Sequence, residues 1–218
     1  MTALAVRRIG WSHPELAAAA VAAGAWALLL GHAEHPHGPG EPYLANLSGW
    51  TVMAVAMMVP GALADVRIVA LSSMWPRRQR TIALFLGSYV CVWIAFGVVA
   101  VAAAAEASVG VLLALAAAWE LSAWKWRAVR RCHLIGALPP RGASADAACA
   151  RAGLRYGWRC VVSCWPLMLA MAAAGHQAMA LMALLTVVVA AEKIVVRSAR
   201  LRGPAAALLA GAALLAFV

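Results

Sequence analysis

Long apolar stretches alternate with short polar segments along the whole chain. The pattern predicts seven helices, at about residues 14 to 31, 44 to 64, 81 to 104, 108 to 124, 157 to 174, 178 to 196 and 203 to 218. A helix of roughly 20 apolar residues crosses a hydrocarbon core of about 30 Å. The stretches lack the period-2 alternation of barrel strands. We therefore predict an all-α fold, a polytopic transmembrane helix bundle.

Basic residues lie between the apolar stretches in four clusters. All 18 Lys and Arg residues fall at Arg7 and Arg8, Arg67 to Arg80, Lys125 to Arg159, and Lys193 to Arg202. Connections near residues 32 to 43, 105 to 110 and 175 to 178 carry none. Because cytoplasmic loops are enriched in Lys and Arg, we predict a cytoplasmic N-terminus, an outer C-terminus and a place in the bacterial cytoplasmic (inner) membrane.

The first apolar stretch also has a second interpretation. Arg7 and Arg8 precede it, and it ends in the small-residue pattern Gly31-His32-Ala33, as a cleaved signal peptide does. Six helices with the same orientation would then remain.

Composition agrees with a lipid environment. The chain is 65% hydrophobic and 12% charged, which leaves too much apolar surface for a water-soluble core. Its net charge of +10, interleaved with apolar stretches, fits topology and contact with the lipid bilayer, and we expect no nucleic-acid binding. We interpret residues 1 to 218 as one integral membrane domain with a basic cytoplasmic loop at 125 to 156, where 144 to 151 is a candidate short helix.

Sulfur-bearing side chains provide the first candidate chemistry. Cys160 and Cys164 are four residues apart, so a helix presents both thiols on one face, which Met168 continues. The predicted second helix offers a matching set, Met53, Met57 and Met58. Thiolate and thioether ligands suit Cu(I). Packing is the alternative, since methionine is an ordinary filler of apolar cores. A disulfide between the two cysteines is not expected on a reducing cytoplasmic side.

Two prolines follow these sulfur clusters. Pro60 comes after Met58, and Pro166 comes after Cys164. Each proline should kink its helix and free a backbone carbonyl, and membrane transporters place ions at such interruptions.

Several motifs resemble a known family. They read Trp50-x-x-Met53-x-x-Ala56-Met57-Met58-x-Pro60, Gly87-x-Tyr89-x-x-x-Trp93, Gly157-x-x-Cys160-x-x-x-Cys164-Trp165-x-x-Met168 and Glu192-Lys193. Their order and spacing over about residues 45 to 195 resemble the predicted metal-binding integral membrane proteins catalogued as domain of unknown function 2182. The resemblance implies metal binding and, for members labelled copper chaperones, copper handling.

The chain departs from that family in its cysteines. Cys132 is followed by His133 where the family has paired cysteines, and Ser163 stands where a third cysteine is usual beside Cys164. Cys132, His133, Cys160 and Cys164 remain as an inner ligand set if the basic loop folds back. We expect Arg159 to favour the thiolates.

The predicted outer loop contains three histidines, His32, His35 and His37. A short His-rich tract is a compositional sign of metal binding, and it suits Cu(II), Ni(II) or Zn(II). A solvated polar loop is the equal alternative.

Charged residues form the last constellation, at the predicted cytoplasmic helix ends: Asp65, Glu120, Lys125, Glu192 and Lys193. Acids inside a membrane are costly and are candidates for proton or ion relays. Alternatively, these side chains pair and snorkel to the interface. We favour pairing and snorkelling for the lysines and leave both readings open for Glu192.

Together these patterns predict a metal-binding membrane protein that binds a copper ion and passes or sequesters it. A membrane or periplasmic partner protein is expected, and no haem or nucleotide, because none of the histidines lies deep in a predicted span. We expect no enzymatic activity. The alternative is a structural or assembly subunit in which Met and Cys serve packing alone.

Overall fold

The computed structural model describes residues 13–32, 43–132, 135–136, 138–139, 141–174, 179–194 and 202–216. All regular elements in this part of the chain are helical, which confirms the all-α class. The α-helices are α2 (Leu16–His32), α3 (Tyr43–Met58), α4 (Leu63–Leu71), α5 (Arg78–Ala105), α6 (Val109–Glu120), α7 (Ala123–Cys132), α8 (Ala143–Ala174), α9 (Met179–Ile194) and α10 (Arg202–Leu215). Two 3₁₀ turns, η1 (Pro60–Ala62) and η2 (Trp75–Arg77), precede α4 and α5.

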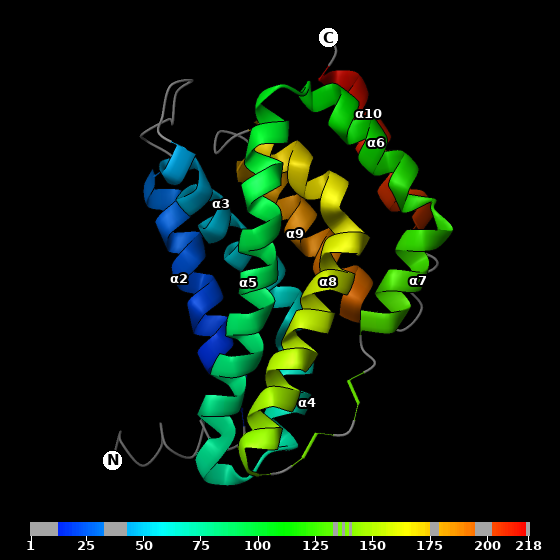
Figure 1. Cartoon of the computed structure of the whole chain (residues 1–218). Helices are drawn as coiled ribbons and strands as arrows, with labels where there is room; N and C mark the ends of the chain where they lie inside the picture. The colour runs from blue at the N-terminus through cyan, green and yellow to red at the C-terminus, as the bar shows by residue number, and fades with distance from the viewer. Residues whose placement is uncertain are drawn as a thin grey trace.

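The long helices α5 and α8 pack side by side through the centre of the molecule (Figure 1). Helices α2 and α3 lie on one side of this pair. On the other side, α6 packs against α8, and α10 packs against α6. Gly157 permits the close approach of α5 and α8, because a Cβ atom there would lie 2.9 Å from Val92 Cβ and 3.2 Å from the Tyr89 carbonyl oxygen. The next turn of α8 carries Cys160, so this contact also positions the candidate metal ligand.

Aromatic side chains fill the core between these helices. The rings of Tyr89 and Tyr156 meet edge to face with centroids 5.4 Å apart, and Phe85 lies 5.6 Å from Tyr156. Trp50 of α3 donates its indole N–H to the Trp93 carbonyl at 2.9 Å. These contacts join α3, α5 and α8 into one rigid core.

Two described helical segments, Trp75–Ala104 and Ala143–Ala174, are long and apolar enough to cross a membrane. Helices α3 and α4 meet at a bend of 44° and together make a third such segment, Tyr43–Met58 with Pro60–Leu71. Three shorter apolar helices cover Leu16–Gly31, Val109–Glu120 and Gly203–Leu214. The arrangement of seven spans stays a prediction.

Several predicted boundaries were wrong. The predicted helix at 44 to 64 is broken after Met58, because Pro60 interrupts it. After the turn η1, helical structure continues as α4 to Leu71. The predicted helix at 108 to 124 ends at Glu120, and Ser122 then caps a separate helix, α7, with its hydroxyl accepting from the backbone N–H of Trp124 at 3.1 Å.

The predicted loop at 125 to 156 is largely helical instead. It contains most of α7 and the first half of α8, which starts at Ala143 rather than at residue 157. The candidate short helix at 144 to 151 is part of α8. Small and apolar side chains recur there at helical spacing and are buried, at Ala145, Cys149, Gly153 and Tyr156, while arginines occupy the exposed face. The high density of basic residues concealed this amphipathic pattern.

Candidate metal centre

Two interrupted helices form the framework of the candidate site. The helix α3 ends at Met58, and the chain turns through η1 at Pro60. In α8, Cys164 has non-helical backbone angles (φ −138°, ψ 16°) two residues before Pro166. Both predicted proline interruptions are therefore confirmed.

The carbonyls freed by the prolines are bonded to tryptophan side chains. Because proline lacks an N–H, the carbonyl four residues earlier loses its helical partner, which is Ala56 for Pro60 and Val162 for Pro166. Trp26 donates its indole N–H to the Ala56 oxygen at 3.0 Å, and Trp119 donates to the Val162 oxygen at 3.1 Å. Each released carbonyl therefore has an indole as its hydrogen-bond donor.

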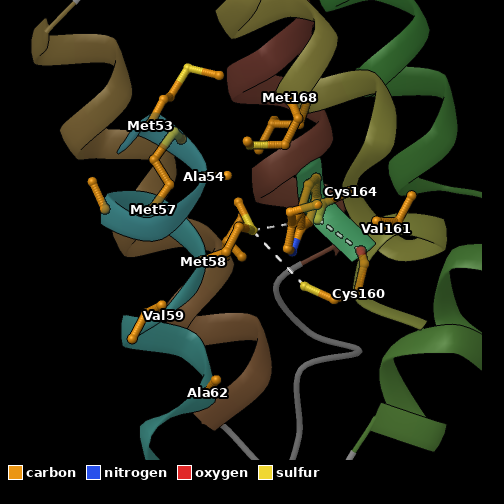
Figure 2. Packing of buried hydrophobic residues seen from close by; sticks show 14 of the residues in the cluster. Met53, Ala54, Met57, Met58, Val59, Ala62, Cys160, Val161, Cys164 and Met168 are labelled. Carbon is orange, nitrogen blue, oxygen red and sulfur yellow. Dashed lines mark hydrogen bonds between the residues drawn. The ribbon is translucent and has the colours of Figure 1, made fainter. Parts of the chain in front are cut away.

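Three sulfur atoms converge where the two interruptions face each other (Figure 2). Met58 Sδ lies 3.7 Å from Cys164 Sγ and 4.0 Å from Cys160 Sγ. All three side chains are buried, and both cysteines are free thiols, as expected for this pair. The interruption at Pro60 and the kink at Cys164 thus bring together sulfurs from segments about a hundred residues apart in sequence.

Cys160 also has two polar neighbours. Lys193 Nζ, from the end of α9, donates to Cys160 Sγ at 2.8 Å. The Tyr89 hydroxyl lies 3.2 Å from the same sulfur and 3.2 Å from the Met58 carbonyl oxygen. The thiol therefore has a cation and a hydroxyl beside it within the protein interior.

The cation beside the thiol was misassigned from the sequence. Arg159 donates instead to the Arg131 carbonyl oxygen at 2.6 Å, and Lys193 takes the expected role. Lys193 does not snorkel, because its side chain is buried with Nζ 5.5 Å from the centre of the Tyr156 ring. A buried ammonium requires such partners to offset the cost of leaving water.

A second buried charge cluster lies nearby. Lys125 of α7 forms ion pairs with Glu120 of α6 and with Glu192 of α9, the latter at 2.9 Å. The predicted pairing is confirmed, but snorkelling was wrong here too, because all three side chains are buried. The cluster joins three helices next to the sulfur site.

The other predicted sulfur ligands are buried but are not among the three sulfur atoms that converge. Met53 and Met57 are buried on the turns of α3 that precede Met58, and Met168 is buried one turn beyond Cys164 (Figure 2). Cys132 is the last residue of α7 and is buried.

None of the described residues at the sulfur site is a histidine. His32 is the last residue of α2, and His35, His37 and His133 lie outside the described residues. In the part of the chain that the structure describes, no three His, Cys, Asp or Glu side chains form a metal-binding group. The candidate site therefore depends on the thioether of Met58 as its third donor.

The sequence pointed to no site role for Tyr89, and it placed Lys193 only among the charged residues at the helix ends, with pairing and snorkelling favoured. A signal was present, since both belong to the recurring motifs, as Gly87-x-Tyr89 and Glu192-Lys193. Only the tertiary structure, in which α5 packs on α8 and α9 packs on η1 and α3, places both side chains beside Cys160.

A family model described as "PpoB2: Copper chaperone" matches residues 47–216. The match contains Met58, Cys132, Cys160, Cys164 and Lys193, whereas His32, His35 and His37 precede it. No curated protein and no solved structure matches the chain. Since the family model spans most of the sequence, including the residues that converge on the buried sulfur atoms, this chain belongs to the PpoB2 copper-chaperone family.

Proposed function

We propose that this protein is an integral membrane copper chaperone that holds one Cu(I) ion between Cys160, Cys164 and Met58 and passes it to a partner protein. The observation that carries the proposal is the convergence of three soft donors, with the Met58 sulfur 3.7 and 4.0 Å from the two thiols. Bonds of about 2.3 Å, the length found for zinc thiolates, would hold three sulfurs around one ion at mutual distances of about 4 Å. The two distances from Met58 Sδ therefore suit a shared soft metal ion.

Charge balance supports the same site. Two thiolates and one Cu(I) ion form a complex with one net negative charge, which is costly in a buried position. Lys193 supplies one positive charge 2.8 Å from Cys160 Sγ. We assign Lys193 the role of counter-cation to the copper complex, with the Tyr89 hydroxyl orienting the same sulfur.

Exposed apolar surface supports a place in the membrane. Val21 and Leu30 on α2, Val99 on α5 and Val187 on α9 are all more than half exposed. Water does not favour so many large apolar side chains on several helices, whereas lipid does. We propose the bacterial cytoplasmic membrane and seven crossings, in which α3 with α4 makes one crossing.

The distribution of charge supports the proposed orientation. Arg80 and Asp146 form an ion pair at 2.7 Å that joins the starts of α5 and α8, and Glu15 before α2 lies 3.5 Å from Arg67 of α4. These pairs mark the end of the molecule that we assign to the cytoplasm.

Other methionines extend the proposed path. Met53 and Met57 precede Met58 on α3, and Met168 follows Cys164 on α8, so all three lie on the outer side of the sulfur cluster in the proposed topology. We propose that they, together with His32, His35 and His37 of the outer loop, lead the ion between the outer face and the buried site. Copper is cargo in this scheme, and no chemical conversion is required.

Cu(I) titration of the purified protein against a coloured chelator tests the site. The double variant Cys160→Ser/Cys164→Ser should lose about one equivalent of Cu(I), because serine is nearly isosteric but a poor soft ligand. Met58→Leu should weaken binding while keeping the packing, at a cost under about 1.5 kcal/mol of stability.

Matched variants separate ligation from packing. Cys149→Ser changes another buried cysteine of the same helix, and Met74→Leu changes a methionine outside the sulfur cluster. Both should bind copper as the unmodified protein does. An unchanged copper content in the double serine variant would return the cysteines to a packing role and favour a structural subunit.

A further inference from the structure

A cavity of about 350 Å³ lies between the end of α7, the following segment and α8. Arg151, Arg155 and Arg159 line it. They are four residues apart along α8, so their side chains share one face of the helix. The volume falls within the range of small-molecule sites.

The cavity carries unbalanced positive charge. Among the described residues that line it, none is acidic. Arg151 and Arg155 are exposed, and Asp146 on the preceding turns of α8 is paired with Arg77 and Arg80. Guanidinium groups in such a row suit carboxylate or phosphate groups of a ligand.

One wall of the cavity is formed by side chains that also contact the residues around the sulfur site. Tyr156 lines the cavity, and its ring lies 5.5 Å from Lys193 Nζ and 5.4 Å from the Tyr89 ring, the two residues that contact Cys160. Cys132 also lines the cavity and belongs to the same buried core as Cys160. A single layer of side chains thus separates the arginines from the buried sulfurs.

We infer that this cavity binds a small anionic thiol that carries Cu(I), such as a glutathione-like peptide, with its carboxylates on Arg151 and Arg155 and its thiol directed to Cys132. The thiol part of this inference rests on the proposed copper site, whereas the anion binding does not. Cys132 then acts as the first protein ligand between the carrier and Cys160.

Exchange along this path requires no redox step. Cu(I) keeps its oxidation state at each transfer. The incoming protein thiol forms a bond to copper and loses its proton, while the bond to the carrier thiolate breaks and that thiolate takes up a proton. Protons and charge balance without another reactant.

Binding of glutathione without copper, measured by calorimetry on the full-length protein in detergent, tests the cavity. The double variant Arg151→Gln/Arg155→Gln should bind at least tenfold more weakly. Arg127→Gln, an exposed arginine of α7 outside the cavity, should bind as the unmodified protein does. The Cys160→Ser/Cys164→Ser variant should keep glutathione binding, so failure of the copper site would be distinguishable from failure of the cavity.

The rate of Cu(I) uptake provides the second readout. Uptake from a Cu(I)–glutathione complex should slow at least tenfold in the double arginine variant, and uptake from a Cu(I)–acetonitrile complex should not change, since that donor has no carboxylates. Absence of glutathione binding, or equal binding by the Arg151→Gln/Arg155→Gln protein, overturns the inference. A lipid head group is the other possible anion, and glutathione binding in nanodiscs of defined lipid tests for it. If binding persists in phosphatidylcholine but is abolished in phosphatidylglycerol, the cavity holds a lipid head group and the inference fails.

Discussion

At the scale of single residues, Lys193 determines the character of the buried site. Its ammonium lies 2.8 Å from Cys160 Sγ, inside a core in which most neighbours are apolar. Residues that contact a metal ligand without binding the metal orient it and adjust its charge, and their loss commonly lowers metal affinity 10- to 100-fold. The strength of copper binding should therefore depend on a side chain that does not touch the ion.

Replacement of Lys193 provides a test at this scale. Lys193→Met keeps a long apolar side chain and removes the charge, so we expect Cu(I) affinity to fall about 10- to 100-fold while about one equivalent still binds. Competition with chelators of graded affinity would measure the change. Lys193→Arg keeps the charge and should retain more of the affinity. Equal affinity in the methionine and unmodified proteins would show that Lys193 has only a structural role.

At the scale of elements, two interrupted helices create the site, and tryptophans stabilise the interruptions. Trp26 and Trp119 donate to the carbonyls that Pro60 and Pro166 release. An unsatisfied buried carbonyl costs free energy comparable to a lost hydrogen bond. Each interruption therefore combines a proline with an indole from another helix, and the tertiary contact preserves the bend.

Removal of one indole donor tests this account. Trp119→Phe leaves the Val162 carbonyl without its partner, so we expect the free energy of unfolding to fall by about 1–3 kcal/mol. Thermal or denaturant unfolding of the purified protein would measure it. Trp124→Phe changes an exposed tryptophan and should have little effect. Equal losses in the two variants would mean that the indole hydrogen bond does not stabilise the kink of α8.

At the scale of the whole molecule, α5 and α8 extend from one end to the other, and their starts lie together (Figure 1). Arg77 and Arg80 of this end pair with Asp146 at the start of α8. The short turn with Glu106 between α5 and α6 lies at the opposite end and carries no basic residue. In the proposed topology, the cavity lined by Arg155 opens toward the cytoplasm.

Cysteine labelling in intact cells tests that topology. Glu106→Cys and Arg141→Cys both replace exposed residues. A membrane-impermeant maleimide should label the first in intact cells and the second only after permeabilisation. A background in which the exposed Cys91 is serine removes the other accessible thiol among the described residues. Labelling of both sites in intact cells would exclude the proposed orientation.

The sequence alone determined the helical class, most helix positions, the two proline interruptions and the set of candidate sulfur-bearing residues. These features follow from local properties: apolar runs, the missing N–H of proline and the spacing of side chains along a helix. The basic segment at 125 to 156 was misinterpreted because a regular pattern of small buried residues, such as Ala145 and Cys149, was hidden among arginines.

Only the tertiary structure decided which of the candidate sulfurs meet and which charges accompany them. Spacing placed Cys160 and Cys164 on one face, but it did not distinguish Met58 from Met53 or Met57, because that choice depends on the bend at Pro60. The same holds for Lys193, whose residue type suggested snorkelling. Its burial depends on the fold, because the energy of a charged group is set by neighbours from distant parts of the chain.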